Sequence, residues 1–146
     1  MEIVSGCAIK RNNKILMVKE AKKICYGKYN FPAGHVDENE LITDAAIREV
    51  YEETGLTLLD YKLRGEIIFH IDDLIETCYL YTANKFDGEI RECDEGELHW
   101  VKKSELFDLP MWEADHLFLR KLINDEDFFR IKLVYINDKL ISVEYL

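Results

Sequence analysis

The strongest constraint on the fold is the stretch "GHVDENELITDAAIREVYEETGL" at residues 34–56, where a loop runs into a predicted helix. Apolar residues recur at helical spacing from about Leu41 to Thr54, and Gly55 follows where a left-handed helix cap belongs. The expected apolar face comprises Ala45, Ala46, Val50 and Thr54, with Leu41, Ile42 and Ile47 beside them. This stretch therefore predicts a helix with one face in the core.

The same helix carries three glutamates near its C-terminal end. Residues three and four apart share a helix face, so Glu49, Glu52 and Glu53 should form one cluster opposite the apolar face. That end of a helix disfavours anions, and a bound divalent cation such as Mg²⁺ would remove the cost. The alternative is a solvated acidic face with Arg48 nearby. A Glu40–Arg48 ion pair could also tie the preceding loop to the helix.

The rest of the chain alternates predicted strands with a second helix. Strands are expected at residues 3–20 as a pair turning near 11–14, at 62–71 and 74–86 around a turn at Asp72-Asp73, and at 97–106 running into a helical turn. The second helix is expected at residues 113–124, with Leu117, Leu119, Leu122 and Ile123 available to the core. We expect a single α/β domain over residues 1–146, an α/β/α sandwich with a mixed central sheet and two main helices.

The last residues, 125–146, predict a C-terminal β-hairpin extension that turns at Asn137-Asp138. Two roles are open for this hairpin: an element of a dimer, or a cover for the edge of the sheet. The sequence leaves the oligomeric state undecided, with a dimer among the options.

Charge and cysteine content restrict the partners. The net charge of −10 argues against binding a nucleic acid polymer, but it permits a phosphorylated small molecule neutralised by metal ions. The four cysteines include no CxxC pair, which favours a reducing compartment over a zinc cluster. There is no signal peptide pattern and no apolar run long enough to cross a membrane, so we expect a cytoplasmic protein without membrane contact.

Residues 34–56 resemble the signature of the Nudix hydrolases, G-x5-E-x7-R-E-U-x-E-E-x-G-U, where U is a bulky aliphatic residue. All nine specified positions match: Gly34, Glu40, Arg48, Glu49, Val50, Glu52, Glu53, Gly55 and Leu56. The coarse order of elements suits that family's α/β/α fold over residues 3–124, whereas the final hairpin is not implied. The resemblance implies Mg²⁺-dependent hydrolysis, with Mn²⁺ as a substitute, of a nucleoside diphosphate linked to another group.

The resemblance also implies roles for the signature residues. Glu49, Glu52 and Glu53 would be metal ligands, assisted by the backbone carbonyl of Gly34. Glu52 or Glu53 would act as the catalytic base toward water, and both are therefore candidate catalytic residues. Glu40 and Arg48 would hold the scaffold of loop and helix. By the same resemblance Glu95, five residues before Trp100, would join the metal site; the alternative is an acidic surface loop.

Three further features resemble the 8-oxo-purine nucleoside triphosphatases of the MutT class. Trp112 would stack on a purine, Asp115 would bind the edge of the base, and Asn30 would contact the base. The adjacent pair of acids in those enzymes is not reproduced, because Ala114 precedes Asp115. The alternatives are a structural tryptophan at a helix start and a turn asparagine. Among the nearby lysines, Lys23 is the candidate for contact with the phosphates.

The leading functional hypothesis is hydrolysis of a nucleoside triphosphate, such as the oxidised purine 8-oxo-dGTP, to monophosphate and pyrophosphate. Other substrates within the same chemistry are ADP-ribose, a nucleotide sugar, a dinucleoside polyphosphate and thiamine diphosphate. Two further classes are a non-catalytic nucleotide-binding Nudix module and an acidic domain stabilised by Ca²⁺. The intact glutamates argue against the first, and the lack of an EF-hand loop argues against the second.

Overall fold

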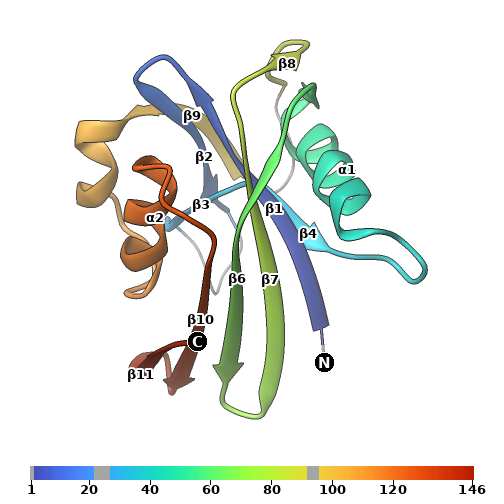
Figure 1. The fold of residues 1–146 in the computed structure, drawn as a ribbon. Coiled ribbons are helices and arrows are strands. Elements are labelled where there is room, and N and C mark those ends of the chain that lie inside the picture. The colour runs from blue at the N-terminus through green and yellow to red at the C-terminus, as the bar shows by residue number, and fades with distance from the viewer. Residues whose placement is uncertain (1, 22–26, 92–95) are drawn as a thin grey trace.

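A mixed β-sheet separates two helices, α1 (Ile42–Thr54) and α2 (Asp115–Ile123), in the computed structural model (Figure 1). The structure describes residues 2–21, 27–91 and 96–146. The strands are β1 (Glu2–Arg11), β2 (Lys14–Glu20), β3 (Tyr29–Asn30), β4 (Ala33–His35), β5 (Thr57–Leu58), β6 (Lys62–Ile71), β7 (Leu74–Ala83), β8 (Phe86–Asp87), β9 (Gly96–Lys102), β10 (Phe129–Ile136) and β11 (Lys139–Tyr145), and a 3-10 helix, η1, covers Lys103–Asp108.

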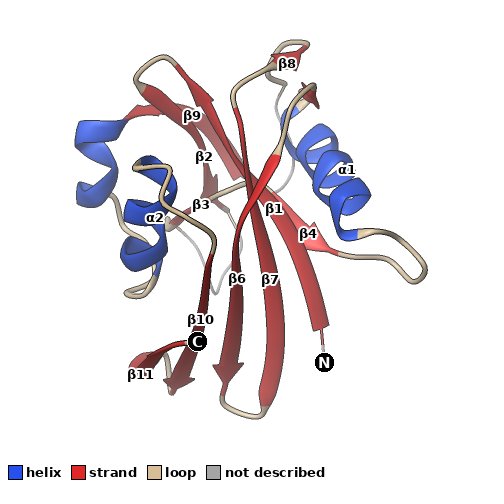
Figure 2. Ribbon diagram, viewed as in Figure 1, coloured by secondary structure: helices blue, strands red, loops and turns tan. Residues whose placement is uncertain are grey.

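Strand β1 lies at the centre of the sheet. The order of strands is β11-β10-β6-β7-β1-β2-β3, with β4 paired to β1 and β9 paired to β2. The β1–β7 and β6–β10 pairs are parallel, and the others in this sheet are antiparallel (Figure 2). Residues Val4 to Lys10 of β1 are all buried, because both faces of the strand are covered. The predicted α/β sandwich with a mixed central sheet is therefore confirmed.

Each face of the sheet has its own hydrophobic core. On one face, Ala46 and Val50 of α1 pack with Cys7 and Ile9 of β1. On the other face, the buried core residues come from α2, β1, β2, β6, β7, β10 and η1: Phe118, Leu119, Leu122, Val4, Ala8, Ile15, Met17, Ile67, Cys78, Leu80, Ile131, Leu133, Tyr135 and Leu106, among others. The alternation of side chains along β1 directs successive residues to the two cores.

Both helices are anchored to β1 by side-chain hydrogen bonds. Ser5 Oγ donates to the backbone carbonyl of Ile42 at 2.7 Å, at the start of α1. The buried Lys10 Nζ donates to the carbonyl of Leu122 at 2.7 Å and pairs with Asp125 Oδ1 at 2.6 Å, at the end of α2. A cation at the C-terminal end of a helix is favourable, and Lys10 lowers the pKa of Asp125.

Two expected core residues lie at the surface instead. Leu41 precedes the first residue of α1 and is exposed, because the chain there is still extended. Leu117 is 37% exposed, whereas its neighbour Phe118 is 5% exposed. The buried residues of α2 are Phe118, Leu119 and Leu122, which share one face of the helix. Leu117 lies on another face and points away from the sheet.

The C-terminal hairpin contributes one strand to the core. β10 pairs in parallel with β6, and its Ile131 and Leu133 are fully buried. β11 follows after the turn at Asn137-Asp138 and forms the outer edge. The hairpin thus covers the edge of β6. A role in a dimer stays a prediction. No helix within the described residues is long and apolar enough to span a membrane.

Candidate active site

The acidic face of α1 meets the backbone of β4. Glu53 is buried, Glu49 is half-buried and Glu52 is exposed. A Cβ atom added to Gly34 would overlap the carboxylate of Glu49, so only glycine permits this approach of carboxylate to backbone. The structure therefore places the Glu49 carboxylate against the Gly34 backbone. Glu53 is buried with Ala46 and Val50, and not opposite that apolar face as helical spacing predicted. The metal site stays a prediction.

Arg48 fastens the loop before α1 to the helix. Its Nε and Nη2 atoms donate to Glu40 Oε2 and Oε1 at 2.9 and 3.0 Å, the fork geometry expected for this pair. Arg48 Nη2 also donates to the His35 carbonyl at 2.9 Å, and Glu40 accepts the Asp37 backbone N–H at 2.9 Å. Hydrogen bonds from Arg48 and Asp37 lower the pKa of Glu40 to about 2. The predicted Glu40–Arg48 ion pair is present.

Arg48 also reaches two of the candidate metal ligands. Its Nη1 atom lies 2.8 Å from Glu49 Oε1 and 3.2 Å from Glu52 Oε2. Glu40 and Glu49 in turn raise the pKa of Arg48, which stays charged. One guanidinium therefore offsets part of the repulsion among the acids and fixes two carboxylates in place.

The donor set fits a hard divalent cation. Three carboxylates and a backbone carbonyl offer oxygen atoms only, which Mg²⁺ and Mn²⁺ prefer. Glu49, Glu52, Glu53 and the Gly34 carbonyl would hold it. Glu95 and Lys23, the other two predicted contacts on this side, lie outside the described residues.

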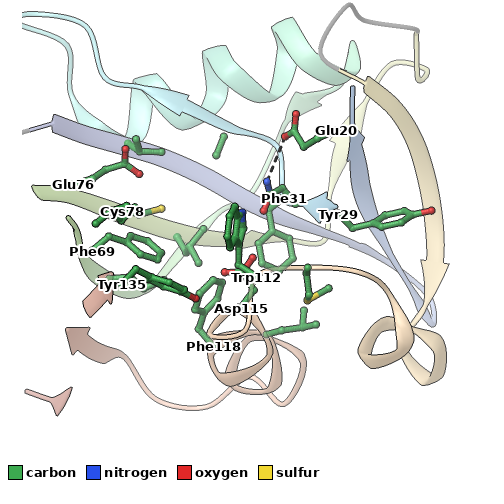
Figure 3. Close-up of a pocket in the computed structure, with 18 of the residues that line it drawn as sticks. Glu20, Tyr29, Phe31, Phe69, Glu76, Cys78, Trp112, Asp115, Phe118 and Tyr135 are labelled. Atoms are coloured by element: carbon green, nitrogen blue, oxygen red, sulfur yellow. Dashed lines mark hydrogen bonds between the residues drawn. The ribbon is translucent and has the colours of Figure 1, made fainter. Parts of the chain in front are cut away.

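A cavity of about 550 Å³ lies on the opposite face of the sheet, beneath α2 (Figure 3). Its wall includes the apolar residues Val4, Met17, Ile67, Leu80 and Leu119, and the aromatic residues Tyr29, Phe31, Phe69, Trp112, Phe118 and Tyr135. The three residues predicted to contact a base, Asn30, Trp112 and Asp115, all line this cavity. They come from β3, α2 and the segment before α2, and the fold brings them together.

Trp112 is half-buried at the cavity wall. Its ring makes an edge contact with Tyr135, with 6.1 Å between centroids. Lys28 Nζ lies 4.8 Å from the centroid of the Trp112 ring. The indole is thus packed against β10, as the structural alternative requires, and it still faces the cavity.

Asp115 begins α2 and points into the cavity. Burial raises the pKa of Asp115 to about 7, and a backbone hydrogen bond at Trp112 offsets part of this rise. Near neutral pH this carboxyl group is therefore available both as a hydrogen-bond donor and as an acceptor.

Asn30 lies in β3, paired with Val18 of β2, and not in a turn. Its Nδ2 atom is 3.5 Å from Glu20 Oε1, a long hydrogen bond across these strands. The amide faces the cavity, so the alternative of a turn asparagine is wrong.

Sequence reasoning missed several residues of the cavity wall, including Phe69, Glu76, Cys78 and Tyr135. Alternation along β6 and β7 indicates that Glu76 and Cys78 share a face. It does not indicate that this face meets α2.

Comparison with known proteins identifies the family and the fold. The profile of the NUDIX domain family matches residues 2–122. The oxidized purine nucleoside triphosphate hydrolase of Danio rerio is 28% identical over 140 residues, which cover 91% of this chain and 90% of that protein. The 8-oxo-dGDP phosphatase NUDT18 of Danio rerio is 44% identical over 115 residues, 71% of this chain, but the chain spans only 33% of that protein's length.

Among solved structures, the MutT protein of Bacillus halodurans superposes with a TM-score of 0.93 over 99% of this chain and 97% of that one. At 24% identity this similarity shows the fold alone, and it includes the C-terminal hairpin. The matched domain covers most of the chain and contains the complete loop–helix signature. The chain therefore belongs to the NUDIX domain family and is a Nudix hydrolase, an enzyme that hydrolyses pyrophosphate bonds with a divalent cation.

Proposed function

We propose that this enzyme hydrolyses a purine nucleoside triphosphate, with an oxidised purine such as 8-oxo-dGTP as the candidate, to monophosphate and pyrophosphate with Mg²⁺. One observation carries the proposal: the aromatic cavity and the α1 glutamates meet at β4. Ala33 lines the cavity, and the next residue, Gly34, faces Glu49. A nucleotide whose base binds in the cavity would extend across β4, so that its phosphates would lie near the glutamates of α1.

The residues of the α1 side suit the phosphates of such a substrate. A bound divalent cation supplies charge neutralisation for the phosphates and a more acidic water. Glu52 or Glu53 would accept the proton of the attacking water. Arg48 would orient Glu49 and Glu52, and Glu40 would hold Arg48 through its two hydrogen bonds.

The cavity supports a purine as the base. Its volume falls in the range of small-molecule sites, and Trp112 offers a surface for stacking. Asp115, with its pKa of about 7, can donate to an oxo group when protonated and accept from an N–H group when ionised. The relative named as an oxidized purine nucleoside triphosphate hydrolase aligns over most of its length, which favours the same substrate class.

A second candidate is an oxidised purine nucleoside diphosphate. It is favoured by the relative named as an 8-oxo-dGDP phosphatase, which has the higher identity of the two relatives but aligns over a third of its length. The products separate the candidates, because a triphosphate would release pyrophosphate and a diphosphate would release phosphate.

The test is a substrate panel with Mg²⁺ or Mn²⁺. It contains the common nucleoside triphosphates, their 8-oxo derivatives, 8-oxo-dGDP, ADP-ribose, a nucleotide sugar and a dinucleoside polyphosphate, with release of monophosphate, phosphate and pyrophosphate followed. We expect 8-oxo-dGTP to give the highest kcat/KM. A preference for ADP-ribose or a nucleotide sugar would replace the proposed substrate, and no turnover of any compound would indicate a non-catalytic nucleotide-binding module.

A further inference from the structure

Glu76 is a carboxylate of the cavity wall that no part of the signature explains. It lies on β7, two residues before Cys78, so both side chains point to the same face of the sheet. Glu76 is half-buried and lines the cavity together with Phe69, Trp112 and Asp115. Figure 3 shows Glu76 and Asp115 entering the cavity region from different elements, β7 and α2.

The described residues give Glu76 no hydrogen bond and no close ion pair. Its nearest titratable neighbours are His35 and Glu2, which bind each other at 2.9 Å between His35 Nε2 and Glu2 Oε2. Burial raises the pKa of Glu76; His35 lowers it, and Glu2 raises it. A carboxylate in the cavity wall that receives no donor from the described residues is available to accept a hydrogen bond from a ligand.

The cavity as a whole is acidic. Five carboxylates line it, and no lysine or arginine does so among the described residues: Glu20, Asp72, Glu76, Asp115 and Asp138. Phosphate groups would be repelled from this wall, which is consistent with phosphates on the α1 side and the base in the cavity. The carboxylates of this wall favour a ligand that presents N–H groups to them as hydrogen-bond donors.

We propose that Glu76 is a specificity-determining residue that accepts a hydrogen bond from an exocyclic amino group of the bound purine. The inference rests on the proposed function in one respect, namely that the purine base of the nucleotide binds in this cavity. An ionised carboxylate is an acceptor only, so an amino group satisfies it and a base edge without a donor does not. Asp115 supplies the second polar contact from α2.

The consequence is a preference for purines that bear an amino group. Losing a hydrogen bond to a charged group weakens binding by about tenfold to a hundredfold. Hypoxanthine differs from guanine only by the missing 2-amino group, and unsubstituted purine differs from adenine only by the missing 6-amino group. These two pairs therefore isolate the amino groups at positions 2 and 6.

The experiment is calorimetric binding of nucleoside monophosphates, which needs neither metal nor turnover. GMP is compared with IMP, and AMP with purine riboside monophosphate, on the wild-type chain. EDTA is included, because ligand atoms of Glu2, His35 and Glu76 lie within 4.8 Å of one another and a stray cation could occupy Glu76. We expect the amino-bearing member of at least one pair to bind about tenfold or more tightly.

The variant Glu76→Met should abolish that preference. Glu76→Ala removes the same acceptor without adding a large side chain, so it gives the same answer if the methionine repacks the cavity. Asp73→Asn is the matched control, because Asp73 is an exposed acid in the β6–β7 turn and does not line the cavity. Asp73→Asn should keep the wild-type preference.

Equal binding within both pairs by the wild type, no binding of any of the four, or an unchanged preference in both Glu76 variants would overturn the inference. Its failure is distinguishable from failure of the proposed function. Turnover of purine triphosphates without an effect of Glu76 rejects only the inference. A preference that depends on Glu76, without turnover of any triphosphate, rejects only the proposed reaction.

Discussion

The two faces of the sheet hold carboxylates in opposite ways. On the α1 face, Arg48 binds Glu40, Glu49 and Glu52, so these acids are held in place by a shared cation. On the α2 face, Asp115 and Glu76 stand in an aromatic cavity whose described wall has no lysine or arginine, and burial raises both pKa values. The pKa of Glu40 on the first face is lowered, whereas the pKa values of Asp115 and Glu76 on the second face are raised.

This difference suits two tasks. Carboxylates held at fixed positions suit a divalent cation, whereas carboxyl groups in an aromatic cavity suit hydrogen bonds with a neutral base. Changes on the α1 face should therefore act on kcat, and changes on the α2 face should act on substrate binding. The predictions below test this division.

The largest effect is expected for Glu53→Gln on the α1 face. Glu53 is buried, and the substitution removes one charge from the proposed metal ligands and one candidate base. We expect kcat to fall by about 100-fold or more, with the binding of nucleoside monophosphate unchanged. Initial rates at several Mg²⁺ concentrations measure the first quantity, and calorimetry measures the second.

Glu105→Gln is the control for this substitution. Glu105 is an exposed acid of η1 and should keep the wild-type kcat. Full Mg²⁺-dependent activity in Glu53→Gln would show that the metal-site assignment is wrong.

The Glu40–Arg48 pair of the α1 face could be predicted from the sequence because its residues are close together in the chain, separated by eight residues. Helical spacing predicts that Glu49, Glu52 and Glu53 lie near one another, but it does not predict that Glu53 is buried with Ala46 and Val50. The contact of Gly34 with Glu49 follows once β4 lies beside α1.

The cavity could be predicted only in part because its wall is assembled from distant segments. Glu76 comes from β7, Phe69 from β6 and Tyr135 from β10. Alternation shows which residues of a strand share a face, but pairing of strands decides which face meets α2. For the same reason the parallel pairing of β10 with β6 was not foreseen, although the hairpin was.

A second prediction concerns the stability of the α2 side. Leu133 of β10 is fully buried and lies opposite Phe69 of β6, a residue of the cavity wall. Leu133→Ala should lower the free energy of unfolding by about 2–5 kcal/mol, because it leaves a void in the core. Urea unfolding followed by fluorescence measures the change.

The matched control is Val143→Ala on β11, directly opposite Leu133 and 39% exposed. It should cost about 0.5 kcal/mol or less. Equal losses for the two variants would contradict the view that β10 belongs to the core and β11 only covers the edge.

Trp112→Ala is expected to act mainly on substrate binding, with some loss of stability because the indole also packs against Tyr135. Loss of stacking on a base weakens binding by about tenfold or more, so KM for a purine nucleotide should rise by that factor. The Mg²⁺ dependence of the activity should be unchanged.

Trp100→Ala is the control on the other side of the sheet, since Trp100 stacks on Phe86 and packs against the α1 core. Trp100→Ala should lower stability and leave KM as it is; an unchanged KM in Trp112→Ala would indicate a structural tryptophan.

The smallest effect is expected from Asp115→Asn, as a change in how stability depends on pH. The folded-state pKa of Asp115 is raised from 3.8 to about 7. A raised pKa of an acid means that the folded state favours the neutral form. Its contribution to stability is therefore fully present below the unfolded pKa and is lost as pH rises toward the folded pKa.

The asparagine variant cannot ionise and should not show this loss. Relative to wild type, its free energy of unfolding should rise between about pH 4 and pH 7 and then stay constant. We expect about 1 kcal/mol, less than the full shift implies, because Asp115 keeps some contact with solvent in the cavity. Glu113→Gln, at an exposed acid two residues earlier, controls for the loss of one carboxylate. A difference between Asp115→Asn and wild type that did not change with pH would mean that the pKa of Asp115 is not raised, and the contrast between the two faces would fail at that residue.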